Sequence, residues 1–199
     1  MSNRREFLQM SLAASALPVL AVPGLARDRQ QKLHTWGVVA EATSPLGLSF
    51  LPEATRLGLQ VRTIHDDVTD LWYHELSVRW REAPAVLAGV TLSTSLFCLE
   101  MLARDYGMRV WFRASHNYLP NGQVEHMVSG PDRMIEQASA FGGDWGSGFA
   151  RLAAALPVVD SGKSQKKIVE AATPQTGEPG PMVSWIIAPR FENQRVVIP

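Results

Sequence analysis

The sequence contains one cysteine, Cys98, and this scarcity excludes several kinds of chemistry. Covalent haem attachment requires a Cys-x-x-Cys-His motif, and iron–sulfur clusters and thiolate zinc sites also require several cysteines. We therefore expect no covalent haem and no iron–sulfur cluster within this chain, and the identity of any other cofactor is unknown. Cys98 lies in the apolar segment 96–99, which favours a buried structural thiol over a nucleophile.

The sequence also lacks an excess of either charge and any long apolar segment after residue 26. Its 19 lysines and arginines balance 19 aspartates and glutamates, so it lacks the basic surface that nucleic acids or anionic membranes require. Its later apolar runs are far shorter than the ~20 residues that span a bilayer. We expect a soluble mature protein with no nucleic-acid partner and no integral membrane segment. Gly-rich nucleotide-binding motifs and a Gly-x-Ser-x-Gly elbow are also missing.

The N-terminus carries the most specific motif of the sequence. Residues 4–8 read Arg-Arg-Glu-Phe-Leu, an apolar run follows at 10–22, and small residues stand at Gly24 and Ala26. This arrangement resembles the twin-arginine (Tat) export signal of bacteria. The residues that carry the resemblance are Arg4, Arg5, Phe7 and Leu8.

The resemblance implies that residues 1–26 are a signal peptide, that cleavage follows Ala26, and that the Tat export machinery is a partner. Because the twin-arginine route carries folded proteins, it also implies delivery of a folded domain to the periplasm. An uncleaved N-terminal membrane anchor is the alternative, although the apolar run is shorter than the ~20 residues that a span requires.

For residues 27–199 we expect a single α/β domain, with a small mixed sheet, a parallel βαβ core, an added β-hairpin and flanking helices. Residues 85–114 predict the βαβ core, because an apolar strand, a helix and a second strand follow each other with short links. Asn121-Gly122 predicts the hairpin, since this dipeptide accepts positive φ. Other strands are predicted at 34–40, 61–64, 123–128, 183–188 and 195–198. Other helices are predicted at 44–60, 67–82 and 149–156, and one more helix is predicted to begin near residue 131.

Residues 157–181 are predicted to form a flexible Pro/Gly-rich segment, with a short helical piece near 168–172. The segment contains four prolines, three glycines and three lysines, and long segments of this kind in small domains are usually functional or disordered.

Polar side chains follow the carboxyl ends of four predicted strands, where open α/β sheets bind ligands. Glu41 follows the first of these strands, and His65, Asp66 and Asp67 follow the second. The third is followed by a segment whose helix-start N–H groups and hydroxyls favour an anion; N-capping by Ser93 or Thr94 is the structural alternative. The candidate ligand-binding residues are Glu41, Thr91, Ser93, Thr94 and Ser95.

His116, which follows the fourth strand, and His65 are the candidate catalytic residues, because imidazole acts as a general base near neutral pH. With Asp67 they also offer imidazole and carboxylate ligands to iron, zinc or manganese, although no His-x-His or Glu-x-x-His motif supports this metal site. His74 is interpreted as solvated and His126 as structural.

Four glycines at 142, 143, 146 and 148 surround Trp145. They predict either a close approach between a helix and another surface or, if Trp145 is exposed, a contact for a partner or ligand.

Three functions stay open on the sequence. The first is a soluble periplasmic accessory or ligand-binding protein, such as a small or assembly subunit of a co-exported redox complex, because folded export usually serves cofactor enzymes and this chain lacks cofactor motifs. The second is a periplasmic enzyme that acts on a small anionic substrate with a histidine base at the strand ends. The third is a metal-binding protein that uses His65, Asp67 and His116.

Overall fold

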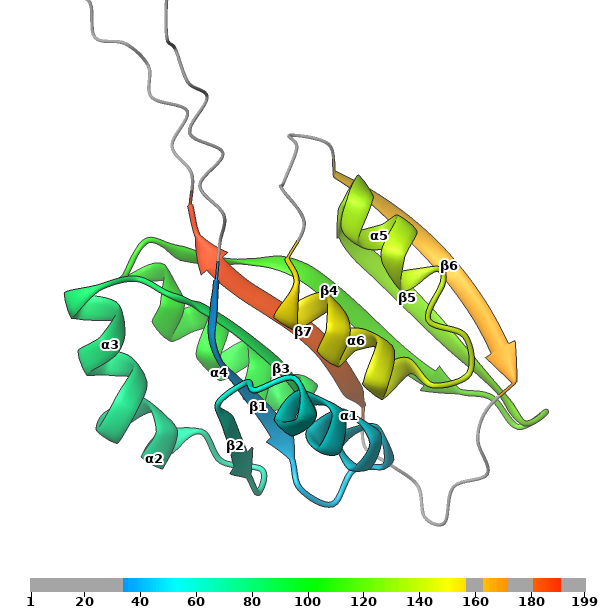
Figure 1. The fold of residues 1–199 in the computed structure, drawn as a ribbon, viewed down its shortest axis with the longest axis horizontal. Coiled ribbons are helices and arrows are strands. Elements are labelled where there is room, and N and C mark those ends of the chain that lie inside the picture. The colour runs from blue at the N-terminus through cyan, green and yellow to red at the C-terminus, as the bar shows by residue number, and fades with distance from the viewer. Residues whose placement is uncertain (1–33, 157–162, 172–180, 191–199) are drawn as a thin grey trace, which may run out of the picture. The chain divides into compact units, whose positions relative to one another are not determined.

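The structure, a computed structural model, describes residues 34–156, 163–171 and 181–190. The described chain has an α/β fold in which seven strands form one mixed sheet (Figure 1). The strands are β1 (Thr35–Glu41), β2 (Val61–Ile64), β3 (Val86–Leu92), β4 (Met108–Tyr118), β5 (Gln123–Pro131), β6 (Lys163–Ala171) and β7 (Met182–Pro189). The helical segments are α1 (Pro45–Arg56), α2 (Thr69–Leu71), the π-helical turn η1 (Trp72–Leu76), α3 (Ser77–Glu82), α4 (Ser93–Arg104), α5 (Asp132–Ala138) and α6 (Trp145–Ala154). The export motif, the cleavage site at Ala26 and the predicted strand at 195–198 lie outside the described residues.

The strands lie side by side in the order β2-β1-β3-β7-β4-β5-β6. β1 pairs in parallel with both β2 and β3, so the units β1–α1–β2 and β2–α3–β3 form the parallel core of the sheet. The remaining pairs are antiparallel. The expected hairpin joins β4 to β5, and Gly122 in its turn has φ +76°, as an Asn-Gly turn requires.

The predicted βαβ unit at residues 85–114 is present as β3–α4–β4, but its two strands are not neighbours in the sheet. β3 and β4 run in the same direction, but β7 lies between them and is antiparallel to both. The seven residues from Met182 to Ala188 are all buried, as expected of a central strand covered on both faces. The apolar segment near the C-terminus therefore completes the middle of the sheet.

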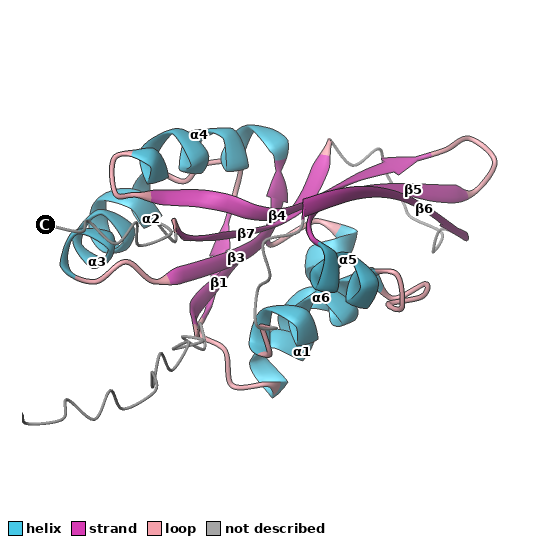
Figure 2. Ribbon diagram, turned by 90° about the horizontal axis from the view of Figure 1, so that it is seen from above, coloured by secondary structure: helices cyan, strands magenta, loops and turns pink. Residues whose placement is uncertain are grey.

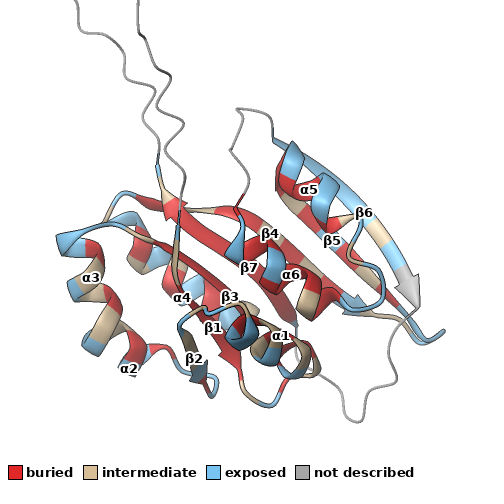
Figure 3. Ribbon diagram, in the orientation of Figure 1, coloured by how far each residue is buried: buried red, intermediate tan, exposed pale blue. Residues whose placement is uncertain are grey.

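Helices cover both faces of the sheet (Figure 2). α1, α5 and α6 lie on one face, and α2, α3 and α4 lie on the other. Each face of the sheet has its own hydrophobic core. Because successive residues of a strand point to opposite faces, Val38 packs in the core beneath α1, α5 and α6, and Val39 packs in the core beneath α2, α3 and α4. The central strands β1, β3 and β7 are buried along most of their length, whereas the edge strand β6 and the outer sides of the helices are largely exposed (Figure 3).

Gly146 allows α6 to pack closely against α1. A Cβ atom at this position would lie 2.7 Å from the Leu46 carbonyl oxygen and 2.9 Å from the Phe50 nitrogen. The glycines near residue 145 thus permit close helix packing. Trp145 itself is only 3% exposed, so the alternative of an exposed contact residue is wrong. It is the first residue of α6, which begins four residues earlier than predicted.

Residues 163–171 form the strand β6, which corrects the flexible segment and the helical piece predicted there. β6 pairs with β5 along its whole length, from Pro131↔Lys163 to Gln123↔Ala171. It is an edge strand of the sheet. The rest of the predicted flexible segment up to residue 180 lies outside the described residues.

Two predictions about α4 are also wrong. Neither Ser93 nor Thr94 caps the helix with its side chain: the cap position is Leu92, and the Ser93 N–H donates to the Pro181 carbonyl at 2.8 Å. Cys98 is exposed rather than buried, because the inner side of α4 is formed by Leu96, Leu99 and Ala103. Among the described helices, none has the length and apolar character needed to cross a bilayer.

Candidate functional site

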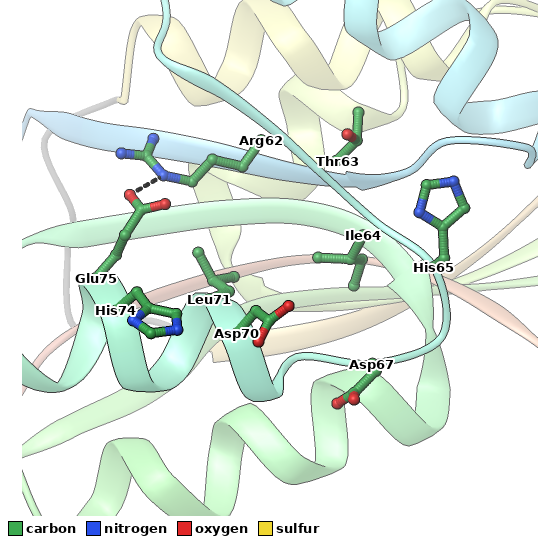
Figure 4. A pocket seen from close by; sticks show the side chains of 9 residues that line it. All are labelled: Arg62, Thr63, Ile64, His65, Asp67, Asp70, Leu71, His74 and Glu75. Atoms are coloured by element: carbon green, nitrogen blue, oxygen red, sulfur yellow. Dashed lines mark hydrogen bonds and ion pairs between the residues drawn. The ribbon is translucent and has the colours of Figure 1, made fainter.

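A polar groove of about 450 Å³ lies between β2 and the helical segment α2–η1 (Figure 4). Asp70 and His74 come from the helical side, and His65 and Asp67 come from the loop that follows β2. Apolar side chains of Ile64 and Leu71 line it as well, and the full set is Arg62, Thr63, Ile64, His65, Asp67, Asp70, Leu71, His74 and Glu75. The groove joins residues from the end of one strand with residues of the next helix, as ligand sites of α/β sheets do.

The π-helical turn η1 determines which side chains reach the groove. An extra residue in this turn separates the buried Leu71 and Leu76 by five positions, whereas Leu76 and Trp80 follow at the α-helical spacing of four. The helix keeps its apolar side toward the sheet on either side of η1. Within it, His74 and Glu75 face the groove. Single π-turns of this kind occur often at functional sites.

Charge in the groove is predominantly negative. Arg62 is the only lysine or arginine among its lining residues, against Asp67, Asp70 and Glu75. The Arg62 guanidinium forms an ion pair with Glu75 and lies 4.1 Å from the centre of the Trp36 ring, so its charge is already engaged. The N–H of Thr69 donates to Asp67 at 2.8 Å, and hydrogen bonding with Thr69 lowers the pKa of this carboxyl. Among the described residues, no lysine or arginine forms an ion pair with Asp67 or Asp70.

Glu41 ends β1 beside this groove and is 5% exposed. Both oxygens of its carboxylate accept from the Asp66 N–H, at 3.2 and 3.3 Å. Asp66 has φ +59°, an unusual backbone conformation of the kind found at functional sites. Burial raises the pKa of the Glu41 carboxyl, and the charge of Asp66 adds to this rise, while the Asp66 N–H and the charge of His65 oppose it.

The predicted anion site at Thr91–Ser95 does not present a common set of exposed hydroxyls. The Trp185 indole N–H donates to the Thr91 hydroxyl at 2.9 Å, and this hydroxyl donates to the Leu92 carbonyl at 3.0 Å. Thr91 and Ser95 are buried, whereas Thr94 is exposed. Ser95 Oγ has no hydrogen-bond partner among the described residues.

His116 lies in a second polar cluster, buried beneath α6. Nδ1 of His116 is 2.6 Å from Nδ1 of His126, its cross-strand partner, and its Nε2 is 2.8 Å from the Ser184 hydroxyl. The Trp145 indole N–H donates to the same hydroxyl at 3.1 Å. The Trp145 ring stacks on His126 with 4.0 Å between ring centres. Since the two Nδ1 atoms face each other, one ring carries a proton there and the other accepts it.

Both histidines of this cluster are neutral at pH 7. Burial lowers the pKa of His116 well below its ordinary value, and the neighbouring His126 lowers it further. Burial lowers the pKa of His126 to about 4. His126 is thus buried and uncharged, and His116 shares its environment.

The two predicted catalytic histidines lie in different places. Four strand-to-strand steps separate β2 from β4, which amounts to about 19 Å at ~4.8 Å per step. His65 is exposed at the groove, whereas His116 is 5% exposed. The metal site of His65, Asp67 and His116 is accordingly not assembled. Within residues 34–156, 163–171 and 181–190, no three His, Cys, Asp or Glu side chains lie close enough together to hold a metal ion.

Sequence reasoning missed most of the groove, because it assigned no role to Arg62, Asp70 or Glu75. Its interpretation of His74 as solvated is confirmed, since this side chain is exposed, but it did not place His74 at the groove. A regular helical wheel could not reveal the π-turn that brings His74 and Glu75 to β2.

No protein-family model matches this sequence. Comparisons with curated proteins and with solved structures also give no significant match. The candidate function therefore depends on the residues and their geometry.

Proposed function

We propose that the protein is an accessory or ligand-binding protein of the bacterial periplasm, exported by the Tat route, with the groove beside β2 as its ligand site. The observation that carries this proposal is the groove itself, a space of about 450 Å³ lined by six titratable side chains and two buried apolar ones. A few polar groups that converge on a pocket of this size are typical of small-molecule sites.

The charges of the groove favour a small, positively charged ligand such as an organic amine. Asp67 and Asp70 line it with no paired cation in the described part of the chain, and Arg62 is occupied by Glu75 and Trp36. An ammonium group bound between carboxylates forms charge-assisted hydrogen bonds, which are stronger than neutral ones. Ile64 and Leu71 offer contact to an alkyl chain.

An accessory role follows from combining the export motif with the helical wall of the groove. Folded export usually serves a cofactor enzyme, and the single cysteine of this chain cannot hold an iron–sulfur cluster. A co-exported redox subunit is the partner that explains this route. The outer side of η1 and α3 exposes Tyr73 (68%) and Val78 (46%), apolar side chains that suit a protein contact next to the groove.

Native mass spectrometry of the protein isolated from the periplasm of its bacterial host tests this proposal. We expect a chain that starts at Arg27 and carries a small molecule or a partner chain. The Asp70→Asn variant should lose a bound small molecule, whereas Glu82→Gln, an exposed carboxylate of α3 outside the groove, should retain it. Replacement of both Arg4 and Arg5 by lysine should keep the full-length chain in the cytoplasm. A bare chain recovered under native conditions would contradict the binding role, and export of the double-lysine variant would contradict the route.

A second candidate function is acid–base catalysis at the same place. It is favoured by the raised pKa of the buried Glu41 carboxyl, since carboxyl groups perturbed by burial are candidates for acid–base catalysis. The exposed His65 lies close to this carboxyl. In that case the bound molecule should be converted during incubation with the wild-type protein. The His65→Gln variant should bind it without converting it.

A further inference from the structure

A second hollow lies at the opposite edge of the sheet from the groove. It has a volume of about 500 Å³ and is formed by the first half of β4, the end of β5 and the start of β6. Cross-strand register places Arg113, Ser129 and Gln165 in one row, and Lys163 stands opposite Pro131, two residues before Gln165 on β6 and therefore on the same face. We call this space the β4–β6 hollow; its lining is Val110, Trp111, Arg113, Ser129, Gly130, Lys163, Ser164 and Gln165.

The hollow differs from the groove in its charge. Its lining contains a guanidinium and an ammonium group, two hydroxyls and one amide, and none of its described lining residues is acidic. All five of these groups can donate hydrogen bonds. Where the groove repels an anion, the hollow therefore offers both positive charge and several donors.

Arg113 has donor capacity that the fold leaves unused. Its Nε is buried and has no hydrogen-bond partner among the described residues. Its contact with Glu100 of α4 is a single 3.4 Å separation from one terminal nitrogen. A guanidinium binds a carboxylate or phosphate best through two parallel N–H groups, and that mode is still open to Arg113.

Protection of the sheet edge explains only part of this arrangement. Lysines on an edge strand discourage pairing with other chains, which accounts for Lys163, Lys166 and Lys167 on β6. It does not account for Arg113, which lies two strands inward on β4 and whose side chain is still 41% exposed. An anionic ligand would use both cations, because the exposed end of the Arg113 guanidinium can donate to it.

We propose that the β4–β6 hollow binds a small organic anion, whose carboxylate or phosphate is held by Arg113 and Lys163 and whose apolar part contacts Val110 and Trp111. Ser129, Ser164 and Gln165 supply further hydrogen bonds to the same group. This site is independent of the groove, because the two lie at opposite edges of the sheet.

Binding of three probes that share one ring tests the site: phenyl phosphate, benzoate and the uncharged benzyl alcohol. Amide shifts in a ¹⁵N–¹H NMR titration should report both anions at β4, β5 and β6, and the alcohol should produce none there. Preference between the two anions identifies the ligand as a phosphate or a carboxylate. We expect Arg113→Gln to weaken binding about tenfold or more, and Lys163→Gln to weaken it about threefold.

Two matched variants control for loss of charge alone. Arg104→Gln removes the other arginine that contacts Glu100, and Lys167→Gln removes a lysine of the same strand; neither residue lines the hollow. Both should bind within about twofold of wild type. Lys163 is exposed, so its variant is informative even if Arg113→Gln fails to fold. Absence of shifts with millimolar anions, equal binding of the alcohol, or binding unchanged by Lys163→Gln would overturn the proposal.

Discussion

At the scale of single residues, Ser184 is the centre of the buried histidine cluster. Its hydroxyl bonds both His116 Nε2 and the Trp145 indole N–H, and it is fully buried. The Ser184→Ala variant leaves both nitrogens without this partner. Because each buried group that loses its hydrogen bond costs about 1–3 kcal/mol, we expect a loss of about 2–4 kcal/mol of unfolding free energy. Urea denaturation measures it, with Ser77→Ala at a half-buried position of α3 as the control. Equal stability of the two variants would contradict the role of Ser184 in the cluster.

The same cluster predicts a loss of stability in weak acid. The pKa values of His116 and His126 are lowered in the folded protein, so between about pH 6.5 and pH 4 the unfolded chain binds more protons than the folded one. The full stability is therefore present above pH 6.5 and falls as the pH decreases. We expect about 1 kcal/mol of loss per histidine between pH 7 and pH 5.5.

Urea denaturation at pH 7 and at pH 5.5 gives the difference in unfolding free energy between the two pH values for each variant. His126→Leu should reduce this pH-dependent difference by about 1 kcal/mol, the contribution of one histidine. His74→Gln, which replaces an exposed histidine outside the cluster, is the control. A His126→Leu protein that keeps the whole difference would exclude the pair as its source.

Part of this residue-level picture could be predicted from the sequence. The Asn121-Gly122 turn brings the two strands of the hairpin together, and His126 was interpreted as structural. Trp145 and Ser184 join the cluster from positions 39 residues apart in the chain. Their meeting depends on how α6 and β7 pack on the hairpin, and no local pattern contains that information.

At the scale of elements, the contact between α1 and α6 depends on Gly146. A methyl group there would meet the Ser49 hydroxyl and backbone atoms of Leu46 and Phe50 at 2.9 Å or less. Since two backbones would have to separate, we expect Gly146→Ala to lower the unfolding free energy by about 1–3 kcal/mol. Gly143→Ala is the control, because a Cβ there has no atom within 4 Å. Thermal melting of both variants checks this, and an unaffected Gly146→Ala protein would show that the helices do not pack as described.

Element positions were predictable where each element has its own pattern, and the sheet order was not. The apolar run at 183–188 predicts a buried strand and β7 is one, yet nothing local places it between β3 and β4. β6 was missed for the opposite reason: its lysine-rich sequence has no apolar alternation, and its pairing with β5 makes it a strand. The π-turn η1 could not be predicted, because the helical period of the sequence alone cannot reveal one inserted residue.

At the scale of the whole molecule, two hollows of opposite charge lie at the two edges of one sheet. The groove beside β2 carries more carboxylates than cations, and the β4–β6 hollow carries cations without carboxylates. The sequence correctly predicted an α/β fold and directed attention to His65 and Asp67 at a strand end. The sequence could not predict the sign of the charge in the groove or in the β4–β6 hollow, because each site is assembled from side chains of separate elements.

The most direct test of the groove as the ligand site compares two four-carbon probes of opposite charge, 1,4-diaminobutane and succinate. Amide shifts in ¹⁵N–¹H NMR spectra of residues 62–75 report binding there. We expect the diamine to shift these amides and succinate to leave them unchanged, because Asp67 and Asp70 have no paired cation in the described part of the chain. Asp70→Asn should weaken binding of the diamine several-fold, by about 1 kcal/mol or more, whereas Glu82→Gln should leave its binding unchanged. Shifts with succinate alone, or diamine binding that is unchanged in Asp70→Asn, would contradict the assignment.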